Sequence, residues 1–161
     1  MKKFSIYFNS MNFKIFLTVI AILIALFLYN YTDTLIKNLQ EREYKLATLY
    51  AKSIEFITNS SNTEQHEFQF IFENIIQKID FPIIYTDNEN KINMNNIYAS
   101  IKNIEIDTTK PLSEISSYLE QIMINMDEIH PPIDIRYGNQ VIGRVHYGDS
   151  FLIKRLKIYP F

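Results

Sequence analysis

The sequence contains no cysteine, only three glycines and only three histidines. Without cysteine the chain cannot form disulfide frameworks, thiolate zinc sites, iron–sulfur clusters or cysteine nucleophiles. All three glycines lie late in the chain, at Gly138, Gly143 and Gly148, so the glycine-rich phosphate loops of Walker and Rossmann nucleotide sites are excluded as well. These absences remove many cofactor-binding and nucleotide-binding classes before any element is placed.

No charge sign is in large excess, because 16 basic and 18 acidic residues give a formal net charge of -2. Bulk electrostatic binding to nucleic acid is therefore not expected. The sequence has no paired carboxylates, His-x-x-x-His helix or Gly-x-Ser-x-Gly elbow, so we expect no catalytic residues, no cofactor and no metal site. Apolar residues are abundant: 47% of the 161 residues are hydrophobic and 14% aromatic, enough for one domain with its own core plus an anchor.

An apolar run near the N-terminus predicts a membrane helix. Residues 13–31 (FKIFLTVIAILIALFLYNY) would span about 28 Å as a helix, close to one hydrocarbon core. Lys2, Lys3 and Lys14 lie at this end without any acid, so the positive-inside rule places a cytoplasmic tail at residues 1–12 and the rest of the chain outside. The alternative is a cleaved signal peptide, but the run ends in bulky residues and has no small-x-small cleavage pattern.

Residues 32–60 predict that the membrane helix continues outward as one long helix, because no proline or glycine interrupts it. A 4,3 spacing typical of a heptad seam is formed by Leu35, Leu39, Arg42, Leu46, Leu49, Ser53 and Phe56. Two interpretations stay open at this point. The stripe packs on its own domain, or it forms the seam of a parallel homodimer.

Residues 61–148 predict a mixed α+β domain with an antiparallel sheet. We expect an amphipathic helix over 63–79, a strand–turn–strand hairpin over 80–92, and a loop with room for an edge strand over 93–109. A further helix follows Pro111 and carries an apolar stripe as far as Met126.

The C-terminal third of the sequence predicts a second hairpin and a last helix. Strands over 133–137 and 140–147 flank Gly138-Asn139, which is a two-residue turn signal. Residues 149–161 then predict an amphipathic basic helix that begins at Asp149 or Ser150 and ends in aromatic residues suited to a membrane interface. This order places both ends of the exported domain at one membrane face.

Six polar or amphipathic residues on or near the predicted strands are candidates for a small-molecule pocket. They are Tyr85, Asp87, Tyr98, Arg136, His146 and Tyr147. The competing interpretation makes Asp87 a turn residue that hydrogen-bonds its own backbone, and places the others on an edge strand or a solvated face.

Four stretches of the sequence together resemble the N-terminal sensor region of membrane-bound sensor histidine kinases of the type common in Bacteroidota. They are Glu41 to Leu46 (EREYKL), Phe81 to Asp87 with Ile92, Met126 to Ile133 (MDEIHPPI), and His146 to Ser150 with Leu152, Leu156 and Tyr159-Pro160. The resemblance implies a PAS-like or Cache-like sensor domain in the periplasm, anchored in a bacterial inner membrane. It also implies a second membrane helix, a dimeric kinase core and a response regulator, none of which this sequence includes before it stops at Phe161.

The resemblance leads to the hypothesis that the chain is the sensing and anchoring part of a two-component histidine kinase. Its partners would be the membrane, a second copy of the chain, and an unknown small molecule or envelope signal. The signal would shift the packing of the 33–59 helix against the 149–158 helix through Leu46, Leu49, Leu152 and Leu156. Two other classes stay open: a stand-alone membrane-anchored binding protein, and a structural or assembly protein without kinase activity.

Overall fold

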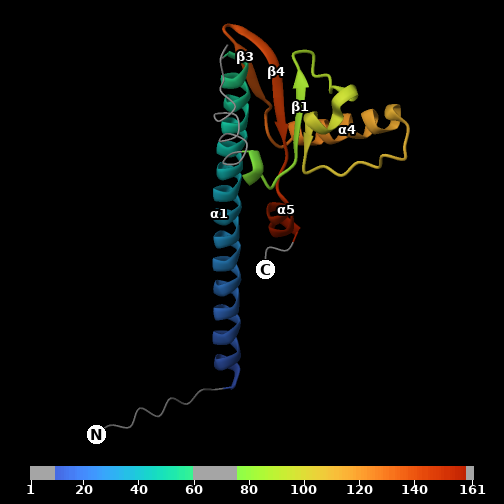
Figure 1. Cartoon of the computed structure of the whole chain (residues 1–161). Helices are drawn as coiled ribbons and strands as arrows, with labels where there is room; N and C mark the ends of the chain where they lie inside the picture. The colour runs from blue at the N-terminus through green and yellow to red at the C-terminus, as the bar shows by residue number, and fades with distance from the viewer. Residues whose placement is uncertain (1–9, 60–75, 159–161) are drawn as a thin grey trace.

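The computed structural model describes residues 10–59 and 76–158, and Figure 1 shows how their helices and strands are arranged. The α-helices are α1 (Ser10–Asn59), α3 (Ile97–Ser100), α4 (Leu112–Asp127) and α5 (Phe151–Ile158). The strands are β1 (Ile83–Asp87), β2 (Ile101–Lys102), β3 (Ile133–Tyr137) and β4 (Gln140–Tyr147), and short 3-10 turns cover Ile76–Lys78 and Met94–Asn96. The α+β class predicted from the sequence is confirmed.

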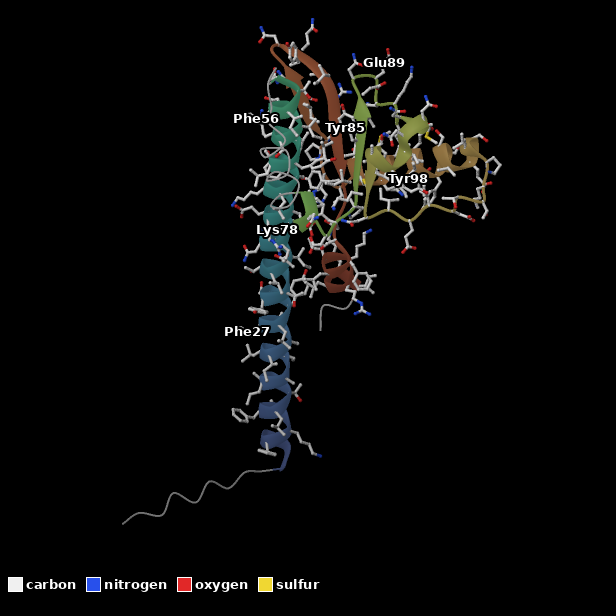
Figure 2. All side chains as sticks on the ribbon, viewed as in Figure 1. Phe27, Phe56, Lys78, Tyr85, Glu89 and Tyr98 are labelled. Atoms are coloured by element: carbon white, nitrogen blue, oxygen red, sulfur yellow. The ribbon has the colours of Figure 1, made fainter. Side chains whose placement is uncertain are left out.

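Helix α1 is one uninterrupted helix of 50 residues, about 75 Å long. None of its most apolar stretch is buried, and Figure 2 shows Phe27 on this bare part of the helix. Within the described residues, α1 is the one helix that is long and apolar enough to cross a membrane, judged by length and composition. The helix predicted over 13–31 is confirmed, and it continues without a break through the predicted outer helix as far as Asn59.

The four strands form one antiparallel sheet in the order β2-β1-β4-β3. Strand β1 pairs along its whole length with β4, from Ile83 opposite Tyr147 to Asp87 opposite Gly143. Its other edge pairs with the two-residue strand β2. The chain therefore joins its first strand to its last, and this pairing places the residues that follow β4 beside those that precede β1.

Each face of the sheet buries its own apolar cluster, because side chains alternate along a strand. Helix α1 covers one face, where Ile83, Val145 and Tyr147 pack with Ala47 and Ala51. The two alanines lack bulky side chains, so the helix can approach the strands closely. Helix α4 covers the other face, where a second cluster consists of Ile84, Ile97, Ile115, Leu119 and Met126. Figure 1 shows the resulting order of α1, sheet and α4.

Several predicted elements are confirmed with close boundaries. Strands β3 and β4 form the expected hairpin around Gly138, whose φ of 58° needs a residue tolerant of left-handed backbone. Helices α4 and α5 lie where the apolar stripes predicted them, and β2 provides the edge strand expected between 93 and 109. The helix predicted over 63–79 falls mostly on residues 60–75, which lie outside the described residues, and Ile76–Lys78 within it forms a 3-10 turn.

The second strand of the hairpin predicted over 80–92 is wrong. Asp87 does form the expected turn, because its Oδ1 accepts hydrogen bonds from the backbone N–H groups of Glu89 and Lys91, each at 2.8 Å. After this turn, however, Ile92 packs against the cluster under α4, and Asn93 caps the 3-10 turn at Met94–Asn96. The edges of β1 are instead occupied by β4 and β2.

Candidate functional site

A polar junction fastens α5 to α1 where the last strand leaves the sheet. We call it the α1–α5 junction and define it by Gln40, Glu43, His130, Asp149, Ser150 and Lys157. Strand β4 ends at Tyr147, and the backbone N–H of Gly148 donates to the carbonyl oxygen of Pro82 at 3.1 Å. The Ser150 hydroxyl then accepts from the N–H of Ile153 at 3.4 Å, which is the geometry of a helix N-cap. Helix α5 therefore starts directly below the sheet, beside α1 (Figure 1).

Asp149 is the centre of the junction. Its side chain is almost completely buried, and its two oxygens accept hydrogen bonds from His130 Nε2 at 2.8 Å, Lys157 Nζ at 2.5 Å and Gln40 Nε2 at 3.2 Å. Burial alone would raise the pKa of this carboxyl, but the hydrogen bonds from His130, Lys157 and Gln40 hold the pKa well below its ordinary value. One carboxylate thus connects α1, the segment before β3, and both ends of α5.

Glu43 is the second buried carboxyl of the junction, and its environment has the opposite effect. It is 5% exposed on the face of α1 that meets α5, and its oxygens accept from the Ser150 N–H at 3.3 and 3.4 Å. Burial raises the pKa of Glu43, and the nearby carboxylates of Asp149 and Asp80 raise it further, while the hydrogen bonds from Ser150 lower it. Because the net shift is upward, the folded chain binds a proton at Glu43 more tightly than the unfolded chain does.

An aromatic pair closes the junction on the side of the sheet. The rings of His130 and Tyr147 stack with centroids 4.6 Å apart, and the Tyr147 side chain is 1% exposed. Burial, assisted by Tyr44 and by the carboxylates of Glu43 and Asp149, raises the pKa of Tyr147 to about 12. The phenol therefore stays neutral at any physiological pH.

A groove opens next to the junction, on the α4 side of the sheet. This α4 groove has a volume of about 510 Å³ and is lined by the part of α4 from Tyr118 to Met126, by Ile129 after that helix, by residues 103–105, and by Asp149, Phe151 and Lys154. A second groove of about 760 Å³ runs further along α4 and shares Glu105 and Tyr118 with the first. The α4 groove is therefore bordered by the same residues that begin α5.

A buried polar chain lies under α4 as well. The Nδ1 of the His146 ring donates to Asp127 Oδ1 at 2.7 Å, and its Nε2 is hydrogen-bonded to the Thr86 hydroxyl at 3.1 Å. This is the order of a nucleophile, base and carboxylate in hydrolases. Thr86 and His146 are 1% and 0% exposed and line neither groove, so a substrate has no access to them. The chain of hydrogen bonds ties α4 to the sheet.

The six residues predicted to bind a small molecule are not brought together. Tyr85 and Tyr147 belong to the α1 side of the sheet, whereas His146 is buried on the α4 side. Asp87 holds its turn, and Tyr98 is 67% exposed on α3; Figure 2 shows Tyr85 and Tyr98 on opposite sides of β1. Arg136, on β3, forms an ion pair with the carboxylate of Asp134 on the same strand. None of the six lines either groove.

The predicted pairing of α1 with the last helix is present, although its contacts differ from those expected. Leu46 packs against the cluster under α1, while Leu49 and Leu152 are about half exposed and Leu156 is partly buried. The sequence does not predict that the junction residues lie together, because a charged residue on a helix is normally expected to be exposed to solvent. Glu43 did carry a signal, since it lies four residues before Ala47 on the packed face of α1.

Neither cofactor nor metal ligands are evident in the part of the chain that the structure describes, where no group of three His, Cys, Asp or Glu side chains could hold an ion. Comparison of the chain with models of known protein families, with curated proteins and with solved structures finds no match.

Proposed function

We propose that this chain is the extracytoplasmic sensing and membrane-anchoring part of a two-component sensor histidine kinase. In this proposal α1 crosses the inner membrane with residues 1–12 in the cytoplasm, and a PAS-like or Cache-like domain lies in the periplasm. A ligand or an envelope stress changes the packing of α1 against α5, and that displacement reaches a dimeric kinase as a shift between two populated arrangements.

One observation carries this proposal: the helix that is apolar enough to cross a membrane also forms a wall of the folded domain, and α5 is fastened to it. Glu43 on α1 accepts from Ser150 at the start of α5, and Asp149 binds Gln40 and Lys157 at the two helices. A rigid helix continuous with a membrane span transmits a displacement along its whole length. A membrane anchor joined by a flexible linker would not do so.

A homodimer is part of the proposal, and the exposed side of α1 supports it. Leu49 and Phe56 are each 49% exposed and lie one heptad apart, on the side of α1 opposite to Ala47 and Ala51. The domain's own packing therefore leaves two apolar positions one heptad apart for a parallel partner helix, while Leu46 packs on the domain's core and Ser53 is buried.

The experiment begins with the native gene, read past the codon for Phe161. The proposal expects an apolar segment of about twenty residues and then a kinase core. The full-length product is then assayed for autophosphorylation in membranes, with Leu46→Asp compared with Lys45→Asp. Leu46 is half-buried against the sheet, whereas the Lys45 side chain is 68% exposed one residue earlier.

We expect Leu46→Asp to change basal or stimulated autophosphorylation, because a carboxylate between α1 and the sheet displaces the helix, and Lys45→Asp to leave both unchanged. Equal phosphorylation in the two variants would contradict the coupling. A reading frame that stops after Phe161 would contradict the kinase assignment. It would leave a membrane-anchored binding protein, the class to which the α4 groove also points.

A further inference from the structure

We propose that the α4 groove binds a small amphipathic organic cation, that is, an ammonium group on an apolar body. The groove's volume of about 510 Å³ lies within the range of small-molecule sites. The proposal names the ligand class for the sensing role proposed above, and only its signalling consequence rests on that role. Binding itself depends on the groove alone.

The walls of the groove are suited to the apolar body. Tyr118, Ile129 and Phe151 line it from α4, from the residues after α4 and from α5, with exposed fractions of 50%, 49% and 68%. Three large side chains that are exposed around one concave surface provide apolar contacts of the kind that line small-molecule sites. Ile122 and Met126 supply further apolar lining.

The charges of the groove favour a cation. Its lining includes Asp80, Glu105 and Lys154, and none of the three forms an ion pair within residues 10–59 and 76–158. Asp149 also lines it, but Lys157 and His130 already bind that carboxylate. Among the lining residues, two carboxylates without an ion pair stand against one such ammonium, an excess of one negative charge that favours a cation over an anion. The guanidinium of Arg155 lies 4.7 Å from the centroid of the Phe151 ring and is not part of the lining.

The ammonium group has a specific place to bind. Glu105 and Tyr118 line both grooves and so mark the point where the grooves meet. The other acids of the second groove are engaged, because Glu114 pairs with Lys110 and Asp107 accepts from Thr109. A carboxylate without an ion pair and an exposed aromatic ring that line the same groove can together recognise an ammonium group, through an ion pair and a cation–π contact.

A lipid of the surrounding bilayer is not the expected occupant, because the groove lies too far from the membrane. Glu43 marks the level at which α5 starts, and it is twelve residues beyond Tyr31, the end of the predicted span. Twelve helical residues correspond to about 18 Å, whereas the headgroup layer adds only about 5 to 8 Å beyond the hydrocarbon core. A soluble molecule reaches the groove, while a lipid held in the bilayer does not.

Binding would act directly on α5. Phe151 and Lys154 belong to that helix, and Asp149 joins it to α1. An occupant that draws Phe151 into the groove therefore changes the position of the helix that the α1–α5 junction fastens.

The test uses the whole chain in lipid nanodiscs and three probes with the same three-carbon phenylpropyl skeleton: 3-phenylpropylammonium, 3-phenylpropan-1-ol and 3-phenylpropionate. Titration calorimetry gives the dissociation constant of each. We expect the ammonium probe to bind about fivefold more tightly than the alcohol, since a partly exposed ion pair is worth up to about 1 kcal/mol. The carboxylate probe should bind more weakly than the alcohol.

Two charge-removing variants give effects of opposite sign. Glu105→Gln should weaken binding of the ammonium probe two- to fivefold without changing binding of the alcohol. Lys154→Gln should strengthen binding of the ammonium probe by a similar factor. Glu89→Gln, in the turn far from the groove, is the matched control and should change neither. Equal binding of all three probes, no saturable binding below about 5 mM, or weaker ammonium binding in Lys154→Gln would each overturn the proposal. Probe binding without any effect on autophosphorylation would contradict the proposed function and leave this site standing.

Discussion

Replacing Asp149 with alanine should destabilise the domain more than removal of any exposed ion pair. Asp149 is 2% exposed and accepts three hydrogen bonds, so its loss leaves His130 and Gln40 without their acceptor inside the junction. Breaking one partner of a buried ion pair costs about 3 to 5 kcal/mol. Because 41% of the Lys157 side chain is exposed, water recovers part of that loss, and we expect a value near 3 kcal/mol.

The measurement is thermal unfolding of the full chain in nanodiscs, followed by the near-ultraviolet circular dichroism of its tyrosines. For a chain of 161 residues, about 3 kcal/mol corresponds to a fall in Tm of roughly 6 to 12 °C. Glu89→Ala is the control, because its ion pair with Lys91 is exposed on both sides and its loss should stay within experimental error.

The pH dependence of the same variant supplies an independent check. The folded chain lowers the pKa of Asp149 from its ordinary 3.8, so the stabilisation is complete above that pH and is lost as the pH falls below it. The difference in Tm between the wild type and Asp149→Ala should therefore be constant at neutral pH and shrink in acid. A fall of less than about 2 °C at pH 7, or a difference that grows in acid, would refute the account of the junction.

Three further substitutions test the fold. The fold raises the pKa of Glu43 from 4.5, so the contribution of this group to stability is present below that pH and is lost as the pH rises. Because glutamine is neutral at every pH, Glu43→Gln should raise the urea midpoint of unfolding at pH 7 and not at pH 4. Gly143→Ala should lower stability by about 1 to 3 kcal/mol in the same urea titration, because a Cβ there would lie 2.7 Å from a carbonyl oxygen of β1, whereas Gly138→Asn should be nearly neutral in an open left-handed turn. Leu119→Ala, at a fully buried position, should lower the free energy of unfolding by about 2 to 5 kcal/mol, and Leu112→Ala, at a 62% exposed position, should lower it far less.

Each of these three predictions has an outcome that would contradict it. A Glu43→Gln variant that is less stable than the wild type at pH 7 would mean that the ionised carboxylate is the form the junction needs. Equal losses for Gly143→Ala and Gly138→Asn would contradict the close approach of β4 to β1. Equal losses at Leu119 and Leu112 would contradict the placement of α4 on the sheet.

The elements that could be predicted from the sequence are those whose signals are local. The β3–β4 hairpin follows from Gly138-Asn139 between two apolar runs, and α4 follows from an apolar stripe that begins just after Pro111. Helix α1 follows from 50 residues without proline or glycine. In each case the residues that determine the element lie within it.

The contacts that could not be predicted join residues far apart in the sequence. Strand β1 pairs with β4, which lies about sixty residues later in the chain. The local pattern instead predicts that β1 pairs with a strand directly after the turn at Asp87, and no such strand forms there. The hydrogen bond between Glu43 and Ser150 spans 107 residues. The position of Glu43 four residues before Ala47 indicates only that it lies on the packed face of α1, and Asp149 before a helix is equally typical of an exposed N-cap, so the sequence does not predict that both carboxylates are buried together. The α4 groove is formed in the same way, by residues from 80 to 154 that only the fold assembles.

The measurement that tests the central claim most directly is the labelling of single cysteines in cells, since the natural chain contains none. One cysteine replaces Glu89, which Figure 2 shows at the end of the domain far from Phe27, and another replaces Lys3 in a separate variant. If α1 carries the domain outside the membrane, a membrane-impermeant maleimide labels Glu89→Cys in intact spheroplasts and labels Lys3→Cys only after lysis. Labelling of both variants before lysis, or of Lys3→Cys alone, would contradict the account.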